Sequence, residues 1–384
     1  MQLALNYPGH PERKGLRLPN VNLLLGGNGS GKSSVFKAIC LGILSDTLVS
    51  SGFRPYYMVR RSGWKTSGIA KIKTDLQFHA PFDGSEDHDF ATECAISIEG
   101  NEEYLEDVNS ENGSRPLRRL MSSDSPSLFL VGYGANRRAA RRDGFSESAN
   151  ERDRSTRYQR VATLFEDAVP LVPVEWFWTQ ARAHSRTDEV SNLVNAILAD
   201  EEVSFTPEET PLFISSGSAL PFEALSDGFR GMLAWLFDLL HHLVRVVPSD
   251  MPLTHLKGVV IVDEIDLLLH PEWQRTVIER LATTFPNLQF IFSTHSPLVA
   301  GTLEPQNIYV LDRDIDGQAV VDQYQENIYG LTANQVLTSS YFGLASTRAP
   351  GTGLLSDLGK LALSEDPADH DAFVKRMVES IPEE

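Results

Sequence analysis

Apolar residues gather in short runs near the start of the chain and again beyond residue 225, with a more polar stretch between them. Three of these runs have the length and composition of buried strands, at 21–25, 258–262 and 289–293. Other segments have the apolar spacing or the start signals of helices, at 34–39, at 227–246 and from Pro271 onward. Strands that alternate with helices at these lengths predict an α/β fold with a mostly parallel sheet.

The polar stretch, 47–215, has a different pattern. Two alternating segments, 69–78 and 90–98, predict a β-hairpin, and 128–134 predicts a further buried strand that ends in a glycine turn. Apolar spacing within 186–199 predicts a helix. Prolines scattered through the stretch exclude one long coiled coil.

These patterns predict a single head with an insertion. We expect its core to come from 1–46 and 216–312, and 47–215 to form an insert with an antiparallel β subdomain and a helical part. A hairpin and a helical tail would follow in 313–384. The acidic segment 312–317 opens like a calcium loop, but its twelfth position is Gln323 instead of a bidentate glutamate, so we expect a hairpin turn there.

Composition narrows the class of protein. Two cysteines among 384 residues are too few for a disulfide framework or a zinc cluster, which favours a reducing compartment. The first residues lack the basic and apolar regions of a leader, and no run approaches the length of a membrane-spanning helix. We therefore expect a cytoplasmic protein without a membrane partner.

The net charge of −18 argues against a general binder of polyanions, yet basic residues are concentrated in two places. The segment 47–74 has six basic residues and no acidic ones, and 115–160 has eleven arginines against five acids. Basic faces on an acidic body could contact nucleic acid or an acidic partner. Solvated faces and internal ion pairs explain the pattern equally well, and both interpretations stay open.

Residues 26–33, G-G-N-G-S-G-K-S, match the phosphate-loop pattern G-x-x-x-x-G-K-[ST] between a predicted strand and a predicted helix. Glycines let the backbone turn tightly and point its N–H groups at phosphate oxygens. Lys32 would reach the β- and γ-phosphates, and the Ser33 hydroxyl would hold Mg²⁺. The candidate nucleotide-binding residues of this loop are Gly26, Asn28, Gly29, Ser30, Gly31, Lys32, Ser33 and Ser34.

Two acids, Asp263 and Glu264, end the β-branched strand at 258–262. Carboxyl ends of parallel strands form the edge at which open α/β sheets bind ligands. Asp263 would hold Mg²⁺, through a water because this ion keeps its hydration shell, and Glu264 would orient or deprotonate the attacking water. His295 follows the next strand and would lie at the same edge, where a γ-phosphate sensor is needed.

Residues 225–230, L-S-D-G-F-R, open the helix at 227–246 with Ser226 and Gly228 at its N-terminus. This end of a helix offers free N–H groups and a positive dipole to an anion. An ordinary N-cap serine is the alternative interpretation of the same residues.

The phosphate loop, the segment 225–230, the strand that ends in Asp263 and Glu264, and His295 follow one another along the chain in the order typical of the ATP-binding-cassette superfamily, and together they resemble it. The phosphate loop, the L-S-x-G signature at 225–228, the Walker B strand with Glu264, the D-loop near Asp266 and the switch histidine His295 all have counterparts there. The resemblance implies an ABC-type ATPase head that uses Mg²⁺ and hydrolyses ATP to ADP and phosphate. It also implies that the signature of one protomer closes over the ATP of another, so that Ser226 acts across a homodimer.

The long stretch between phosphate loop and signature differs from transporter cassettes. The segments 132–137, 263–274 and 292–297 resemble the SMC/RecF-like and OLD-like ATPases instead. Two further segments, 329–332 and 337–344, resemble the PtuA-like ATPases of bacterial anti-phage systems. That likeness implies a dimerising ATPase that regulates a separate effector, such as an HNH-type nuclease.

Other functions remain open at this point. A RecF-type repair or recombination ATPase would act directly on DNA, and a nucleotide-gated scaffold would bind ATP without turnover. A Q-loop glutamine has no clear position, and Gln77 at the end of a predicted strand is the candidate.

Overall fold

The structure is a computed structural model. It describes residues 1–9, 15–50, 53–59, 67–78, 88–100, 102–108, 128–137, 156–167, 169–199, 203–215, 217–315 and 318–347. Within these ranges no helix is long and apolar enough to cross a membrane.

The strands are β1 (Val21–Leu25), β2 (Ser67–Phe78), β3 (His88–Glu99), β4 (Glu102–Asp107), β5 (Leu130–Tyr133), β6 (Val203–Thr206), β7 (Leu212–Ser215), β8 (Ser218–Leu220), β9 (Gly258–Val262), β10 (Leu288–Ser293), β11 (Ile308–Arg313) and β12 (Ala319–Asp322). The α-helices are α1 (Lys32–Ser50), α3 (Thr156–Gln159), α4 (Ala162–Phe165), α5 (Val174–Ala183), α6 (Thr187–Ile197), α7 (Asp227–Val246), α8 (Pro271–Thr284), α9 (Pro297–Ala300) and α10 (Ala333–Thr338).

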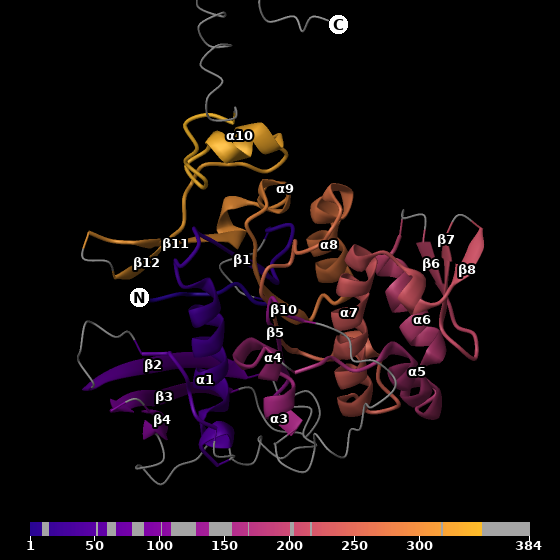
Figure 1. Ribbon diagram of the computed structural model, residues 1–384, viewed down its shortest axis with the longest axis horizontal. Coiled ribbons are helices and arrows are strands. Elements are labelled where there is room, and N and C mark those ends of the chain that lie inside the picture. The colour runs from indigo at the N-terminus through magenta and orange to yellow at the C-terminus, as the bar shows by residue number, and fades with distance from the viewer. Residues whose placement is uncertain are drawn as a thin grey trace, which may run out of the picture.

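A six-stranded sheet in the order β12-β11-β1-β10-β9-β5 forms the centre of the molecule (Figure 1). All its pairings are parallel except that of β11 with β12. The predicted α/β fold with a mostly parallel sheet is therefore confirmed. The edge strand β5 comes from within 47–215, the stretch that we predicted as an insert, and its Leu130 to Tyr133 pair with β9.

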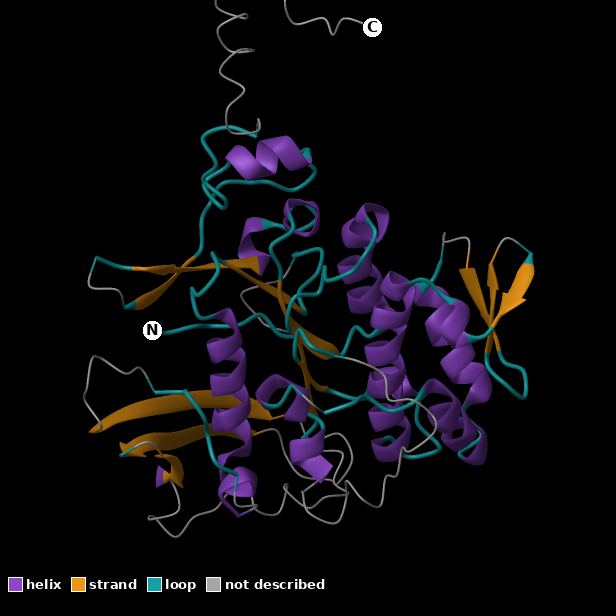
Figure 2. Cartoon of the chain, viewed as in Figure 1, coloured by secondary structure: helices purple, strands orange, loops and turns teal. Residues whose placement is uncertain are grey.

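Two layers cover the sheet because side chains alternate between its faces. Leu24 of β1 packs with α1 and the β2–β3–β4 sheet, whereas Leu23 and Leu25 pack with α5 to α8 on the other face. The two layers lie on opposite sides of the central strands (Figure 2). Long apolar helices supply the second layer, and α7 buries thirteen of its twenty residues.

The antiparallel sheet β2–β3–β4 packs against α1. The predicted hairpin is confirmed as β2 and β3, with Ile72 opposite Cys94, while the sequence pattern did not indicate β4. The Thr92 hydroxyl donates to the Gly42 carbonyl of α1 over 2.7 Å and so links this sheet to the helix behind the phosphate loop.

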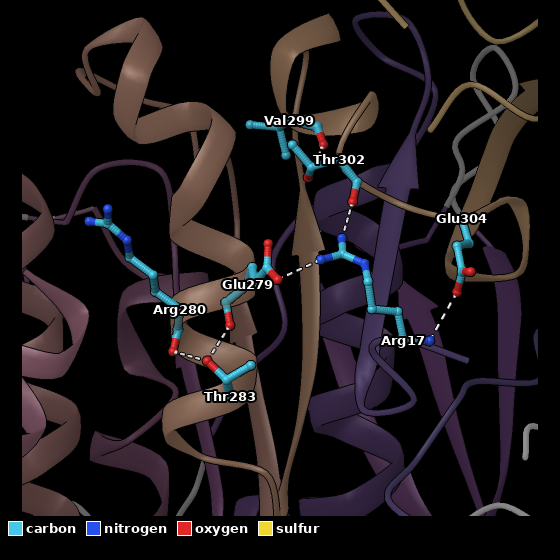
Figure 3. Close-up of polar contacts among 7 residues, drawn as sticks. All are labelled: Arg17, Glu279, Arg280, Thr283, Val299, Thr302 and Glu304. Atoms are coloured by element: carbon cyan, nitrogen blue, oxygen red, sulfur yellow. Dashed lines mark hydrogen bonds and ion pairs between the residues drawn. The ribbon is translucent and has the colours of Figure 1, made fainter. Parts of the chain in front are cut away.

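Arg17 links the segment before β1 to α8 and to the segment that follows α9 (Figure 3). Its guanidinium forms an ion pair with Glu279 of α8 over 2.7 Å and donates to the Thr302 carbonyl over 2.6 Å. Its backbone N–H donates to the Glu304 carboxylate over 3.1 Å. These contacts hold the segment that leads into the N-terminal end of β1.

Candidate nucleotide site

The phosphate loop lies between β1 and α1, as predicted. Gly26 has a φ of 151°, and a Cβ there would lie 2.5 Å from the Leu311 carbonyl oxygen, so no larger residue fits without a shift. Gly29 and Gly31 also have positive φ values, 75° and 107°, which other residues rarely adopt. Ser30 is buried, and its hydroxyl has no hydrogen-bond partner in the described part of the chain. The side chains of Asn28 and Ser34 are exposed beside this loop.

Lys32 begins α1 and turns back over the loop. Its ammonium donates to the carbonyls of Gly26 over 2.8 Å and Gly27 over 3.2 Å. Burial lowers the pKa of Lys32, and the carboxylates of Asp263 and Glu264 oppose this shift. The lysine is thus held at the phosphate loop and faces the carboxylates that end β9.

Ser33 and Asp263, which are 230 residues apart in the chain, meet at this edge of the sheet. The Ser33 hydroxyl donates to Asp263 Oδ2 over 2.5 Å. The other carboxylate oxygen, Oδ1, accepts a hydrogen bond from the buried Ser293 hydroxyl. The two residues that we predicted to bind the metal therefore lie side by side, and Ser293 fixes the orientation of the Asp263 carboxylate.

Glu264 follows in a left-handed conformation, with a φ of 50°. Such a conformation costs a non-glycine residue about 1–3 kcal/mol and persists only where surrounding contacts hold it. Its N–H donates to the Ser293 hydroxyl over 2.8 Å. Among the described residues nothing donates a hydrogen bond to its carboxylate. His295, two residues beyond β10, is exposed at the carboxyl end of that neighbouring strand.

The signature lies at the N-terminus of α7. Ser226 is its N-cap, and the hydroxyl accepts a hydrogen bond from the Phe229 N–H at 3.5 Å, which is long for such a bond. Ser226 is also exposed, so capping and ligand binding are compatible. A Cβ on Gly228 would lie 2.4 Å from the Leu268 carbonyl oxygen. Through this close approach the signature contacts the segment that continues from Glu264.

A further contact joins the predicted D-loop to the strand that carries His295. The Thr294 hydroxyl donates to Asp266 Oδ1 over 2.5 Å, and the Ser296 N–H donates to the same hydroxyl. The segment after β9 and the segment after β10 therefore form one hydrogen-bonded unit.

Arg137, Ser293 and Arg313 are part of this region, and sequence reasoning gave none of them a role. Arg137 donates to backbone carbonyls of the segment after β9, and Arg313 donates to the Gly29 carbonyl of the phosphate loop over 2.8 Å. The Ser293 hydroxyl donates to the Asp263 carboxylate, but its second hydrogen bond and these contacts of the two arginines are with backbone atoms. Contacts to backbone atoms leave no signal in a sequence motif. The sequence indicated this sheet edge only through strand ends, since Arg137 follows one predicted strand and Ser293 ends another.

Gln77 lies elsewhere. It is an exposed residue of β2 that pairs with Asp89, within the antiparallel sheet. The strand that ends beside Asp263 is β5, because the Asp263 N–H donates to the Tyr133 carbonyl over 2.8 Å. The loop after β5 brings Arg137 to this position, and not a glutamine.

The basic residues that the structure describes are largely engaged within the chain. Arg54 pairs with Glu102 and Lys73 with Glu93, each over 3.1 Å. In 115–160 the described arginines are Arg137, Arg157 and Arg160, and all are buried. Internal contacts therefore account for these described residues, while Arg60, Arg61, Lys65 and the other eight arginines of 115–160 lie outside the described residues.

The residues of the site fit a nucleoside triphosphate with Mg²⁺. The loop has an unsatisfied buried hydroxyl at Ser30 and a lysine at its base. Within the described ranges, no group of three or more acidic, histidine or cysteine side chains forms a metal cage. One hydroxyl and one carboxylate, Ser33 and Asp263, suit Mg²⁺, which takes few protein ligands and completes its shell with phosphate oxygens and water.

A protein-family model described as "AAA domain, putative AbiEii toxin, Type IV TA system" matches residues 95–301, more than half of the chain. The chain belongs to this family. The matched range of the AAA domain contains β5, the signature, Asp263, Glu264 and His295, and the phosphate loop lies before it.

Relatives of this AAA-domain protein cover different shares of it. "Septu protein PtuA" of Bacillus mycoides (strain KBAB4) is 28% identical over 346 residues, 89% of this chain and 43% of the relative. "Retron Vc95 probable ATPase" of Vibrio cholerae is 38% identical over 137 residues, 35% of this chain and 26% of the relative. The chain thus spans less than half the length of these curated relatives. The solved SMC head domain from Thermotoga maritima is 14% identical with a TM-score of 0.40, covering 79% of this chain and 90% of that one.

Proposed function

We propose that this protein hydrolyses ATP at a site that a second copy of the chain completes, and that it thereby regulates a partner protein in anti-phage defence. One observation carries the ATPase part of the proposal. The hydroxyl of Ser33 lies 2.5 Å from the Asp263 carboxylate, and Glu264 follows directly, with a carboxylate to which no described residue donates a hydrogen bond. These residues come from segments far apart in the sequence and combine the parts that phosphoryl transfer to water needs.

The binding half of the proposal rests on the phosphate loop. Its N–H groups and the Ser30 hydroxyl would contact phosphate oxygens, and Lys32 would exchange the Gly26 and Gly27 carbonyls for the β- and γ-phosphates. Ser33 and Asp263 would hold Mg²⁺, which neutralises phosphate charge when bound. Asn28, Gly29, Gly31 and Ser34 complete this half of the site.

The chemical half rests on Glu264 and His295. Glu264 would accept a proton from the attacking water, since its carboxylate has no donor among the described residues and its backbone is held in place. His295 would contact the γ-phosphate from the neighbouring strand. The Thr294–Asp266 hydrogen bond would keep the histidine's strand end in register with the glutamate's.

The position of the signature supports the proposed dimer. Ser226 and Gly228 form a helix N-terminus that is exposed to an anion, whereas the phosphate loop begins a different helix. A two-fold arrangement of two copies would place each signature over the other copy's nucleotide. ATP would then stabilise the dimer, and hydrolysis would release it.

The role in defence is supported by the named relatives, a Septu protein and a retron ATPase. We propose a separate effector, such as an HNH-type nuclease, as the regulated partner. Direct action on nucleic acid is the alternative: three of the eleven arginines of 115–160 are buried, and the other eight lie outside the described residues. Purification of this protein together with the product of a neighbouring effector gene would test the proposal, because the activity of the effector can then be compared with and without ATP.

Replacement of Glu264 by glutamine tests the enzymatic proposal. The substitution keeps the size of the side chain and removes its ability to accept a proton. We expect ATP affinity within about threefold of wild type and a turnover at least about 100-fold lower. A Glu264→Gln protein with wild-type turnover would refute the mechanism, and wild-type protein that binds ATP without turnover would identify a scaffold.

A further inference from the structure

Arg137 holds the backbone on which Glu264 is mounted. Its Nη1 donates to the Asp263 carbonyl over 2.5 Å and to the Gly134 carbonyl over 3.1 Å. Its Nη2 donates to the Glu264 carbonyl over 2.8 Å. One planar guanidinium thus joins two consecutive carbonyls after β9 to the end of β5.

The backbone held in this way is unusual at Glu264, whose φ of 50° is rare for residues other than glycine. The Ser293 hydroxyl holds the N–H side of the same residue over 2.8 Å. A rotation of the Glu264 backbone toward an ordinary conformation would turn its carbonyl away from Arg137. The two contacts therefore fix the direction in which the glutamate side chain leaves the chain.

Burial of the charged Arg137 guanidinium costs free energy of desolvation, which argues against an incidental contact with the backbone after β9. Arg137 is 9% exposed, and burial lowers the pKa of Arg137 to about 10, while the nearby carboxylates of Asp263 and Glu264 oppose this shift. Arg137 therefore stays charged at neutral pH. Two acids lie near it, yet each of its hydrogen bonds within the described residues goes to a backbone carbonyl.

We infer that Arg137 is a positioning residue for Glu264: it fixes the strained peptide after β9 so that the glutamate carboxylate points at the attacking water. This inference rests on the ATPase activity proposed above. Arg137 would contact neither nucleotide nor water, so its substitution should change the rate of hydrolysis more than the binding of ATP.

The test compares Arg137→Ala and Arg137→Lys with wild type in steady-state hydrolysis and in equilibrium binding of ATP. We expect kcat to fall about 10- to 100-fold, because a displacement near 1 Å at a catalytic group costs rates of this size. The dissociation constant of ATP should stay within about threefold. Lysine cannot contact two carbonyls in one plane, so Arg137→Lys should restore little, whereas methylguanidine added to Arg137→Ala should restore part of kcat.

Arg17→Ala is the matched control. Arg17 also combines a backbone carbonyl, that of Thr302, with a carboxylate partner, Glu279 (Figure 3), but it lies on the segment before β1. Its loss should lower the midpoint of thermal unfolding and leave kcat unchanged. Equal losses of kcat in both variants would assign Arg137 a general structural role and overturn the inference.

A double substitution separates this inference from the proposed function. If Arg137 acts through Glu264, adding Arg137→Lys to Glu264→Gln should lower kcat by less than about twofold further. A full additional loss would contradict the inference. Unchanged kcat in Arg137→Lys, while Glu264→Gln is inactive, would refute the positioning role alone, and an active Glu264→Gln would refute the proposed function.

Discussion

Ser293 is the buried connection between the two acids of the site, and its removal is a sharp test of their geometry. The side chain is fully buried; it donates to the Asp263 carboxylate and accepts from the Glu264 N–H over 2.8 Å. Ser293→Ala would remove a hydrogen bond to a charged group, worth about 1.5–3 kcal/mol, and would leave the partly buried Glu264 N–H unsatisfied, at up to about 1–3 kcal/mol. Because Asp263 keeps the Ser33 contact, we expect the free energy of unfolding to fall by about 2–4 kcal/mol.

Urea unfolding measures this loss, and phosphate release measures its effect on turnover. We expect turnover to fall about 10- to 100-fold in Ser293→Ala, since both acids lose a fixed orientation. Ser339 is the control, because its buried hydroxyl also has one acceptor, the Val336 carbonyl at 2.6 Å, and one donor, the Tyr341 N–H at 3.4 Å. Ser339→Ala should lose about 1 kcal/mol and keep its turnover. Full turnover in Ser293→Ala would show that the reasoning about the acids is wrong.

Two further predictions concern α7. Gly228→Ala would place a Cβ 2.4 Å from the Leu268 carbonyl oxygen, so we expect the free energy of unfolding in urea to fall by about 1–3 kcal/mol. The ATP-dependent dimer should also be weaker in sedimentation. A dimer of wild-type strength would contradict the predicted role of the signature. Burial lowers the pKa of His241 well below its ordinary value. When the pH falls below about 6.5, the histidine therefore takes up a proton in the unfolded chain before it does so in the folded one. This difference lowers the free energy of unfolding by up to about 1.4 kcal/mol per pH unit. His241→Phe, beside Trp176 and Phe177, should lose this part of the pH dependence between about pH 7 and pH 5.5, and identical slopes for the two proteins would exclude it.

Local patterns predicted the elements that carry the site. The strands β1 and β9 and the helix α7 have the bounds that the apolar runs indicated, because each is buried and has clear polar ends. The phosphate loop, Asp263 and His295 could be placed at one edge because parallel strands share that edge. This part of the arrangement needs only the period of the pattern and the order of the elements.

The remaining features depend on contacts between distant segments. The strand β5 was recognisable as a strand, but its pairing with β9 unites residues more than 120 positions apart, and nothing in its own sequence specifies that partner. Ser293 and Arg137 act largely on backbone atoms, which every residue type provides equally. The left-handed backbone of Glu264 likewise follows from contacts of the whole sheet edge, and a glutamate gives no sign of it.

Mixing two inactive variants would test the composite site most directly. Lys32→Ala disables the phosphate loop, and Ser226→Arg blocks the signature, so each homodimer should be inactive. In a mixed dimer one site combines the intact loop of one copy with the intact signature of the other. Random mixing in equal amounts should therefore restore about one quarter of wild-type turnover per chain. If the mixture stays as inactive as its components while both bind to each other, the site is not shared between copies and the central proposal is wrong.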